Sequence, residues 1–273
     1  MKPKVRVLLP AGYGLNCDAE TIYAFERAGA AVHRVPMNLL FRGEVALGDH
    51  HILVLMGGFG WGDDHGAGVI QAVRFRTHLG EELEAFIERG GLVIGICNGF
   101  QALVNLGLLP GFDGDYRTRS VALLPNDCGM FRDQWVRLVV DPGSPCVFTR
   151  GLEAAELPVR HGEGKFYAAP EVIARLRARR QIVLRYALPE GSPAGGRFPD
   201  NPNGSVEDIA GICDATGRIF GLMPHPEAFN DWTNHPDWPR LKEHARRAGR
   251  PFGTEPPVGL RIFENAVRHF QGS

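Results

Sequence analysis

One cysteine lies where the sequence is best suited to build a nucleophile. Residues 95–101 read Gly-Ile-Cys-Asn-Gly-Phe-Gln, between an apolar run and a helical pattern. A nucleophile on a sharp strand-to-helix turn needs small neighbours, and Gly95 and Gly99 provide them. A helix beginning at Asn98 would point its positive end at Cys97 and stabilise the thiolate. The pattern predicts a reactive thiol and disfavours the alternative, a cysteine that only fills core space.

A glycine-rich turn follows another apolar run, at residues 57–63, and reads Gly-Gly-Phe-Gly-Trp-Gly-Asp. In an open parallel sheet, active sites gather at the carboxyl ends of the strands, so this turn and Cys97 should share one edge. The backbone N–H groups of Gly58 and Asn98 could then hold an oxyanion. The alternative is a turn that only needs positive φ. A dinucleotide site is disfavoured, because the spacing is not Gly-x-Gly-x-x-Gly opening into a helix.

A base for the thiol is found late in the chain, where residues 223–227 read Met-Pro-His-Pro-Glu. An imidazole ordinarily titrates near neutrality, so His225 is suited to act first as a base and then as an acid. Glu227 could accept the other ring N–H and fix the tautomer, and the flanking prolines restrict the backbone. The alternative is one more surface histidine among ten.

The elements that must position these residues alternate in the first half of the chain. Strand–helix alternation with short loops predicts a mostly parallel sheet covered on both faces. Strands are expected at 5–9, 31–35, 51–55 and 92–96, and helices at 19–28, 81–89 and 98–106.

The second half has closely spaced strand patterns and fewer helical ones. We interpret residues 1–273 as a single domain with an elaborated C-terminal segment at about 228–258. A long exposed loop is expected at 188–204, and residues 229–257 show no clear period. Strands are expected at 120–124, 134–140, 181–186, 208–213 and 218–222, and a helix at 258–270.

Composition excludes several classes of protein. The formal net charge of −1 gives no global field for nucleic acid or an anionic membrane. Five cysteines without a CxxC pair argue against a disulfide framework and a zinc ribbon, and fit a reducing cytoplasm. The histidines lack metal-ligand spacing, so no metal site is predicted. No apolar stretch approaches the roughly 18 residues of a membrane span, and the N-terminal apolar run is read as a strand, not a signal peptide.

Two weaker features leave alternatives open. The basic run at 175–180 is interpreted as a solvated helix face in preference to a nucleic-acid contact. Trp232 and Trp238 lie among Asn, Pro and Asp residues, and either anchor an interface or cap a small satellite core.

These motifs resemble those of a known family. The segments GICNGFQ at 95–101 and MPHPE at 223–227 are similar to the class I, or triad, glutamine amidotransferases. Further segments resemble the glutaminase subunits of phosphoribosylformylglycinamidine synthases and cover much of the chain up to residue 227. They are NCD at 16–18, GGFGWGD at 57–63, RHGEGKF at 160–166 and NPNGSVEDIAGICDATGRIFGLMPHPE at 201–227.

The resemblance implies a flavodoxin-like three-layer α/β/α sandwich and assigns a role to each site residue. It makes Cys97 the nucleophile, His225 and Glu227 the rest of the triad, and Gly58 and Asn98 the oxyanion-hole donors. It further implies that glutamine is held by Gln101 and by His161, Gly162 and Glu163.

The same resemblance implies release of ammonia from glutamine for a large ATP-dependent synthetase subunit, and in many species a small third subunit, in de novo purine biosynthesis. ATP and Mg²⁺ are expected only in that partner, and no cofactor in this chain. Three alternatives remain: the glutaminase of an amidotransferase serving GMP, CTP or anthranilate synthesis, a cysteine peptidase or thiol hydrolase, and a non-catalytic binding module. The chain departs from the family pattern at Gly60-Trp61 and in the length of 229–257.

Overall fold

The first half of the chain alternates strand and helix, as the sequence predicts. The computed structural model describes residues 4–272. Short apolar strands are each followed by a glycine-rich or polar turn, which favours this alternation. The elements are β1 Arg6–Ala11, α1 Asp18–Arg27, β2 Ala31–Pro36, α2 Met37–Phe41, β3 Ile52–Leu55, α3 Val69–Glu88, β4 Leu92–Ile96 and α4 Asn98–Leu106.

The second half adds mostly strands. Its elements are β5 Val121–Pro125, β6 Arg132–Val140, β7 Ala154–His161, β8 Glu163–Ala168, α5 Pro170–Ala178, β9 Ile182–Ala187, β10 Ile209–Cys213, β11 Ile219–Leu222, α6 Trp238–Arg247 and α7 Val258–Gln271. Strands β5 and β8 form a separate antiparallel pair.

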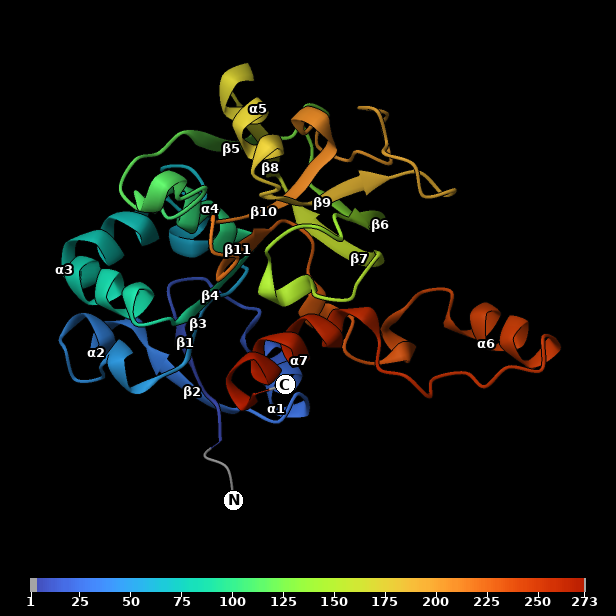
Figure 1. Cartoon of the computed structure of the whole chain (residues 1–273), viewed down its shortest axis with the longest axis horizontal. Coiled ribbons are helices and arrows are strands. Elements are labelled where there is room, and N and C mark those ends of the chain that lie inside the picture. Colours follow the sequence, from blue (N-terminus) through green and yellow to red (C-terminus); the bar gives the residue numbers. More distant parts are fainter. Residues whose placement is uncertain (1–3, 273) are drawn as a thin grey trace.

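One nine-stranded sheet organises the molecule in the order β2-β1-β3-β4-β11-β10-β9-β6-β7 (Figure 1). The first five strands in this order pair in parallel, and they have the order of a flavodoxin-like sheet. The remaining strands extend the sheet with antiparallel pairs. The prediction of an α/β fold with a largely parallel central sheet is therefore confirmed, and the antiparallel part holds β6, β7, β9 and β10 of the second half.

The helices form two groups on either side of the parallel strands. Helix α1 packs against α7, while α3 packs against α2 and α4, and Figure 1 shows the sheet running between these groups. Phe25 of α1 meets Phe263 of α7 edge to face, with ring centroids 4.8 Å apart. Both rings are fully buried, so the C-terminal helix completes one layer of the sandwich.

Helix α3 begins at Val69, so the prediction of a helix beginning at 81 placed its start too late. A buried stripe formed by Phe75, Leu79 and Leu83 carries the helix across Gly80. That stripe has helical spacing on both sides of the glycine, and packing outweighs the glycine's low helix propensity.

Strands β7 and β8 and helices α2 and α6 were not predicted. Strands β7 and β8 meet at Gly162. The glycines at 162 and 164 interrupt the alternation of apolar and polar residues there, so the two strands were not recognised from the sequence. Helix α6 has no buried residue, and its apolar residues Trp238, Leu241 and Ala245 are few among charged ones, so the helix was not recognised although they recur at helical spacing. The loop at 188–204 has no helix or strand, but the expectation that it is exposed is wrong for part of it, because Leu188, Ala194, Asn201 and Asn203 are buried.

The C-terminal segment projects from the body of the molecule and carries α6 at its outer part (Figure 1). Its base is held by Trp232, whose Nε1–H donates to the Glu255 carbonyl at 2.7 Å. The Trp232 ring also contacts the rings of Phe229 and Phe252. For Trp232, these contacts favour the satellite-core alternative. Within residues 4–272, no helix has the length and apolar character that crossing a membrane requires.

Candidate active site

Cys97 occupies the strained turn that its sequence context predicts. It follows β4 and precedes α4 with φ 52° and ψ −107°, a conformation that costs energy in a non-glycine residue. A Cβ on Gly99 would overlap the Leu55 carbonyl, and one on Gly95 would lie 2.6 Å from the Gly99 oxygen. Both glycines are therefore required for the sharp turn that presents the sulfur.

Strand β11 brings His225 to this turn. The Cys97 N–H donates to the Leu222 carbonyl at 2.8 Å, which places the end of β11 beside the elbow. The His225 N–H in turn donates to the Pro158 carbonyl at 2.8 Å. The imidazole Nδ1 lies 2.5 Å from Glu227 Oε1, and both side chains are buried. The structure thus brings Cys97, His225 and Glu227 together from positions far apart in the sequence.

The charges of these groups favour a protonated imidazole. Burial lowers the pKa of His225, but the Glu227 carboxylate and then the Cys97 thiol raise it, and the net pKa lies well above its ordinary value. An imidazolium beside a thiol stabilises the thiolate. His225 Nε2 and Glu227 Oε2 are buried and contact no hydrogen-bonding partner within residues 4–272.

Cys17 is a neighbour of the triad that sequence reasoning did not single out. Its Sγ lies 4.0 Å from His225 Nδ1, and burial raises the pKa of its thiol. Its place in the NCD motif was the available signal. In the described part of the chain, one cluster has metal-ligand geometry, formed by Cys17, His225 and Glu227. The short His225–Glu227 contact already occupies two of its three ligand atoms.

The glycine-rich turn after β3 lies over the elbow. Gly58 has φ 137°, and a Cβ there would lie 2.7 Å from Leu15 Cα, so only glycine fits between the two loops. Within residues 4–272, the N–H groups of Gly58 and Asn98 donate to no protein acceptor. Both predicted oxyanion donors are therefore free to bind a ligand.

Asp63 is a second residue that sequence reasoning missed. Its Oδ1 accepts a 3.0 Å hydrogen bond from Asn98 Nδ2, and so it orients the residue that follows the cysteine. Burial raises the pKa of Asp63 to about 6, and the nearby Glu163 carboxylate adds to the effect. The motif GGFGWGD contained this residue, but nothing in the spacing indicated that it would reach Asn98.

The remaining predicted residues converge on the same edge. The Gln101 amide donates to the Glu163 carbonyl, and Glu163 Oε2 accepts from the Ala67 N–H at 3.2 Å. His161 Nδ1 lies 3.1 Å from Asn126 Oδ1, and burial lowers the pKa of His161 to about 3. His161 is therefore neutral, and its buried Nε2 contacts no partner among the described residues.

The long motif at 201–227 explains how β8 is held. Asn203 Nδ2 donates to the Gly164 carbonyl at 2.8 Å and to the Tyr186 hydroxyl at 3.1 Å. The Phe166 N–H donates to Ser205 Oγ at 2.9 Å. The Asn-Pro-Asn-Gly-Ser part of the motif is thus a buried network that anchors the strand beginning at Glu163.

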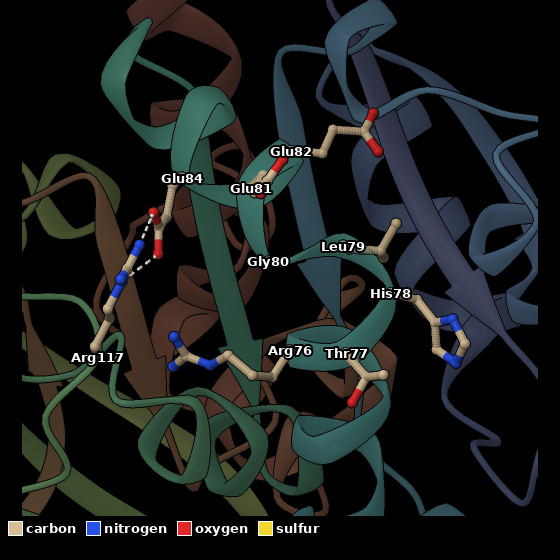
Figure 2. Close-up of a pocket in the computed structure, with 9 residues that line it drawn as sticks. All are labelled: Arg76, Thr77, His78, Leu79, Gly80, Glu81, Glu82, Glu84 and Arg117. Carbon is tan, nitrogen blue, oxygen red and sulfur yellow. Dashed lines mark hydrogen bonds and ion pairs between the residues drawn. The ribbon is translucent and has the colours of Figure 1, made fainter.

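Other polar features of the surface lie outside this site. Figure 2 shows a depression along α3 whose lining includes the Arg117–Glu84 ion pair and none of the predicted site residues. The basic run at 175–180 lies at the C-terminal end of α5, as a solvated helix face should. Its ion pairs are Arg175 and Arg179 with Asp113, Arg177 with Glu207, and Arg180 with Asp141.

Comparison with known proteins defines the class. Residues 4–270 match the family described as CobB/CobQ-like glutamine amidotransferase domain. The chain therefore belongs to this family of glutamine amidotransferases. A solved glutamine amidotransferase from Thermotoga maritima, 16% identical with a TM-score of 0.53, shares the fold.

Within the family, the chain is similar to a particular subunit. It is 43% identical to the phosphoribosylformylglycinamidine synthase subunit PurQ of a Methanococcus maripaludis strain, over 97% of each chain. It is 45% identical to the subunit of that name from Dehalococcoides mccartyi, again over 97% of each. The structure titled PurLQS from Thermotoga maritima matches with a TM-score of 0.70 and 28% identity, over 98% of this chain and 100% of that one.

Proposed function

We propose that this chain is the glutaminase subunit of a phosphoribosylformylglycinamidine synthase. The observation that carries the proposal is the buried Cys97–His225–Glu227 arrangement at the carboxyl edge of a flavodoxin-like sheet, in a chain similar to PurQ subunits over nearly its full length. The chemistry is hydrolysis of the glutamine side-chain amide to glutamate and ammonia.

The reaction begins with attack of the Cys97 thiolate on the side-chain carbonyl carbon of glutamine. The free N–H groups of Gly58 and Asn98 donate to the oxyanion that forms. His225 then protonates the amide nitrogen, the C–N bond breaks, and ammonia departs from a γ-glutamyl thioester on Cys97. Water activated by His225 cleaves the thioester and releases glutamate. Glu227 holds the imidazole in the tautomer that both steps require.

His161 suits the amide end of glutamine. Its Nδ1 faces Asn126 Oδ1, whose amide nitrogen donates elsewhere, so Nδ1 carries the proton and Nε2 is an acceptor. A buried acceptor without a partner is costly, and a substrate N–H would satisfy it. Gln101, Gly162 and Glu163 line the side of the proposed glutamine site next to His161.

The ammonia passes to an ATP-dependent synthetase subunit, which uses it to aminate formylglycinamide ribonucleotide. ATP and Mg²⁺ act in that subunit, and a small third subunit completes the complex in some species. We place this chemistry in the cytoplasm, where reduced cysteines are maintained.

A Cys97→Ala variant tests the chemistry. We expect loss of glutamine hydrolysis, measured as glutamate release, at an unchanged melting temperature, because a small side chain replaces another of similar size. Cys128→Ala, at a half-buried cysteine outside the site, is the matched control and should keep full activity. Normal turnover by Cys97→Ala would refute the nucleophile assignment.

The partner and the rival functions are tested together. Glutaminase activity should be low in the isolated chain and rise when the purified synthetase subunit, formylglycinamide ribonucleotide and ATP are added. Cleavage of peptides in preference to glutamine would favour a peptidase. Stimulation by a GMP, CTP or anthranilate synthase component in place of this synthetase would assign the chain to another amidotransferase.

A further inference from the structure

Two imidazoles that the proposed chemistry does not use lie together near the amino ends of the parallel strands. His33 belongs to β2, and His50 lies just before β3. The nitrogens His33 Nδ1 and His50 Nε2 are 3.1 Å apart, and the two rings stack with centroids 5.3 Å apart. Cys97 and His225 follow the carboxyl ends of β4 and β11, so the histidine pair lies apart from the candidate active site.

A neighbouring carbonyl fixes which nitrogen of His50 carries the proton. His50 Nδ1 lies 3.0 Å from the Ala46 carbonyl oxygen, a contact that requires an N–H. The lone pair of Nε2 is therefore directed toward His33. A metal-ligating histidine usually donates its other ring N–H to a carbonyl or carboxylate in this way. His50 is 7% exposed and burial lowers its pKa, which favours the neutral imidazole that a metal requires.

The separation of the two nitrogens suits a transition-metal ion. Two imidazole nitrogens on a tetrahedral Zn²⁺ are about 3.3 Å apart, because each Zn–N bond is about 2.0 Å long. His33 Nδ1–H donates to His50 Nε2 in the structure. When an ion replaces this hydrogen bond, His33 keeps its proton on Nε2 and its exposed ring needs only a small rotation. Two ligand atoms are thus already in place.

Carboxylates that line the same cavity can complete the ligand set. The cavity has a volume of about 520 Å³, and its lining includes Glu44 and Asp49 beside the two histidines. Both carboxylates are on exposed side chains that can turn toward an ion, and together they offset its double positive charge. Glu44 makes a 3.8 Å surface contact with Arg42, which is easily given up. Arg6 also lines the cavity, but it is exposed and its guanidinium can stay in solvent.

We propose that His33 and His50, with the carboxylates of Glu44 and Asp49, form a binding site for Zn²⁺. The ion has a structural role, because it ties β2 to the turn that precedes β3 across 17 positions of the sequence. It takes no part in glutamine hydrolysis, and the proposal is independent of the proposed function. Sequence spacing did not predict the site, since the two histidines meet only through the pairing of β2, β1 and β3.

Calorimetric titration of the full chain with ZnCl₂ tests the site. His33→Ala should weaken binding of one Zn²⁺ by about 10-fold or more, because loss of a direct ligand costs at least as much as loss of an outer hydrogen-bond partner. The double variant Glu44→Gln/Asp49→Asn should act in the same direction. His244→Ala, at an exposed position of α6, is the matched control and should bind Zn²⁺ as wild type does.

Co²⁺ in place of Zn²⁺ separates this site from the cluster of Cys17, His225 and Glu227, whose ligand atoms also lie close together. The proposed site contains no sulfur, so bound Co²⁺ should show the visible bands of nitrogen and oxygen ligands without a thiolate charge-transfer band. A charge-transfer band of equal strength in wild type and in His33→Ala would place the ion at a cysteine and overturn the proposal.

Thermal unfolding gives a further readout. Zn²⁺ should raise the melting temperature of wild type relative to the same protein in chelator, because a ligand that binds only the folded chain stabilises it. His33→Ala should show no such rise, and its rate of glutamine hydrolysis in chelator should stay within about twofold of wild type.

Equal Zn²⁺ affinity in wild type and in both variants would overturn the proposal, as would the absence of Zn²⁺ binding by the wild-type chain. Either result leaves the proposed function intact, because glutamine hydrolysis is measured in chelator. Failure of the unmodified chain to hydrolyse glutamine would instead refute the proposed function and leave the metal site standing.

Discussion

The His225 imidazole lies against the backbone of Gly57, a residue whose lack of a side chain makes the contact possible. A Cβ at this position would lie 2.7 Å from His225 Cε1 and 3.2 Å from Cys17 Sγ. Gly57 has no positive φ, so the requirement for glycine is one of space alone. The residue thus positions the ring and takes no part in the chemistry.

Gly57→Ala should displace the imidazole and lower kcat for glutamine hydrolysis by about 100-fold, because a misplacement near 1 Å has an effect of that order. Steady-state kinetics of glutamate release measure it. Gly48→Ala is the control, because a Cβ there makes only an ordinary 3.4 Å contact with Arg89. An unchanged kcat in Gly57→Ala would show that the ring is not held by this contact.

Asp63 makes stability depend on pH in a predictable direction. Its pKa is raised from 3.8 to about 6, so the folded chain binds its proton more tightly than the unfolded chain. Stability is therefore lost as pH rises from about 4 to about 6, and the loss is complete above that range. Asp63→Asn removes this charge and keeps an oxygen to accept from Asn98.

The Asp63→Asn variant should therefore melt at a higher temperature than wild type at pH 8, and the difference should shrink toward pH 4. Thermal unfolding at several pH values measures it. Asp133→Asn, at an exposed position of β6, should show no such trend. A constant difference at all pH values would mean that Asp63 titrates normally.

Site residues that stand out by their immediate sequence neighbours were predictable from the sequence. Cys97 and His225 were found because glycines or prolines flank them at strand ends. The contacts of Cys17 and Asp63 were not predictable, because each depends on how two loops distant in sequence pack together.

At the scale of elements, strand β8 depends on a loop for its position. Asn203 satisfies the Gly164 carbonyl and the Tyr186 hydroxyl, and all three groups lie in the interior. Since Gly164 directly follows Glu163, the loop that contains Asn203 also helps to position Glu163 in the proposed glutamine site.

Asn203→Ala removes the hydrogen bonds that its amide donates to two buried polar groups and should destabilise the chain by about 2 kcal/mol. KM for glutamine should rise as well, because the segment beginning at Glu163 loosens. Chemical denaturation and steady-state kinetics check the two effects. Asn38→Ala, at an exposed position of α2, is the control. A stable variant with normal KM would refute the anchoring role.

Elements with a strong hydrophobic period were predictable, and elements held by context were not. The strands β1, β3 and β4 are apolar runs and were placed within two residues of their observed bounds. Strands β7 and β8 join at a glycine-rich motif, where tertiary pairing with β6 and β5 decides the conformation.

At the scale of the whole molecule, we expect the outer part of the projecting C-terminal segment, which carries α6, to be separable from the core. Helix α6 contains no buried residue. The relatives from Methanococcus maripaludis and Dehalococcoides mccartyi each match 97% of the chain, so these matches include most of residues 228–258. Replacing residues 236–250 by a short Gly/Ser linker should change the melting temperature by only a few degrees. Scanning calorimetry measures the change, and basal glutaminase activity serves as the folding control. A large drop in melting temperature would show that the segment is part of the core.

The position of β11 has a consequence for synthesis of the chain. Among the strands in residues 4–272 it comes last in sequence, yet it inserts between β4 and β10, in the interior of the sheet. His225 follows β11 in the sequence. A growing or truncated polypeptide that ends before residue 225 therefore contains Cys97 but lacks the histidine proposed as its base. If His225 is the base, as proposed, a polypeptide that ends before this residue should hydrolyse no glutamine.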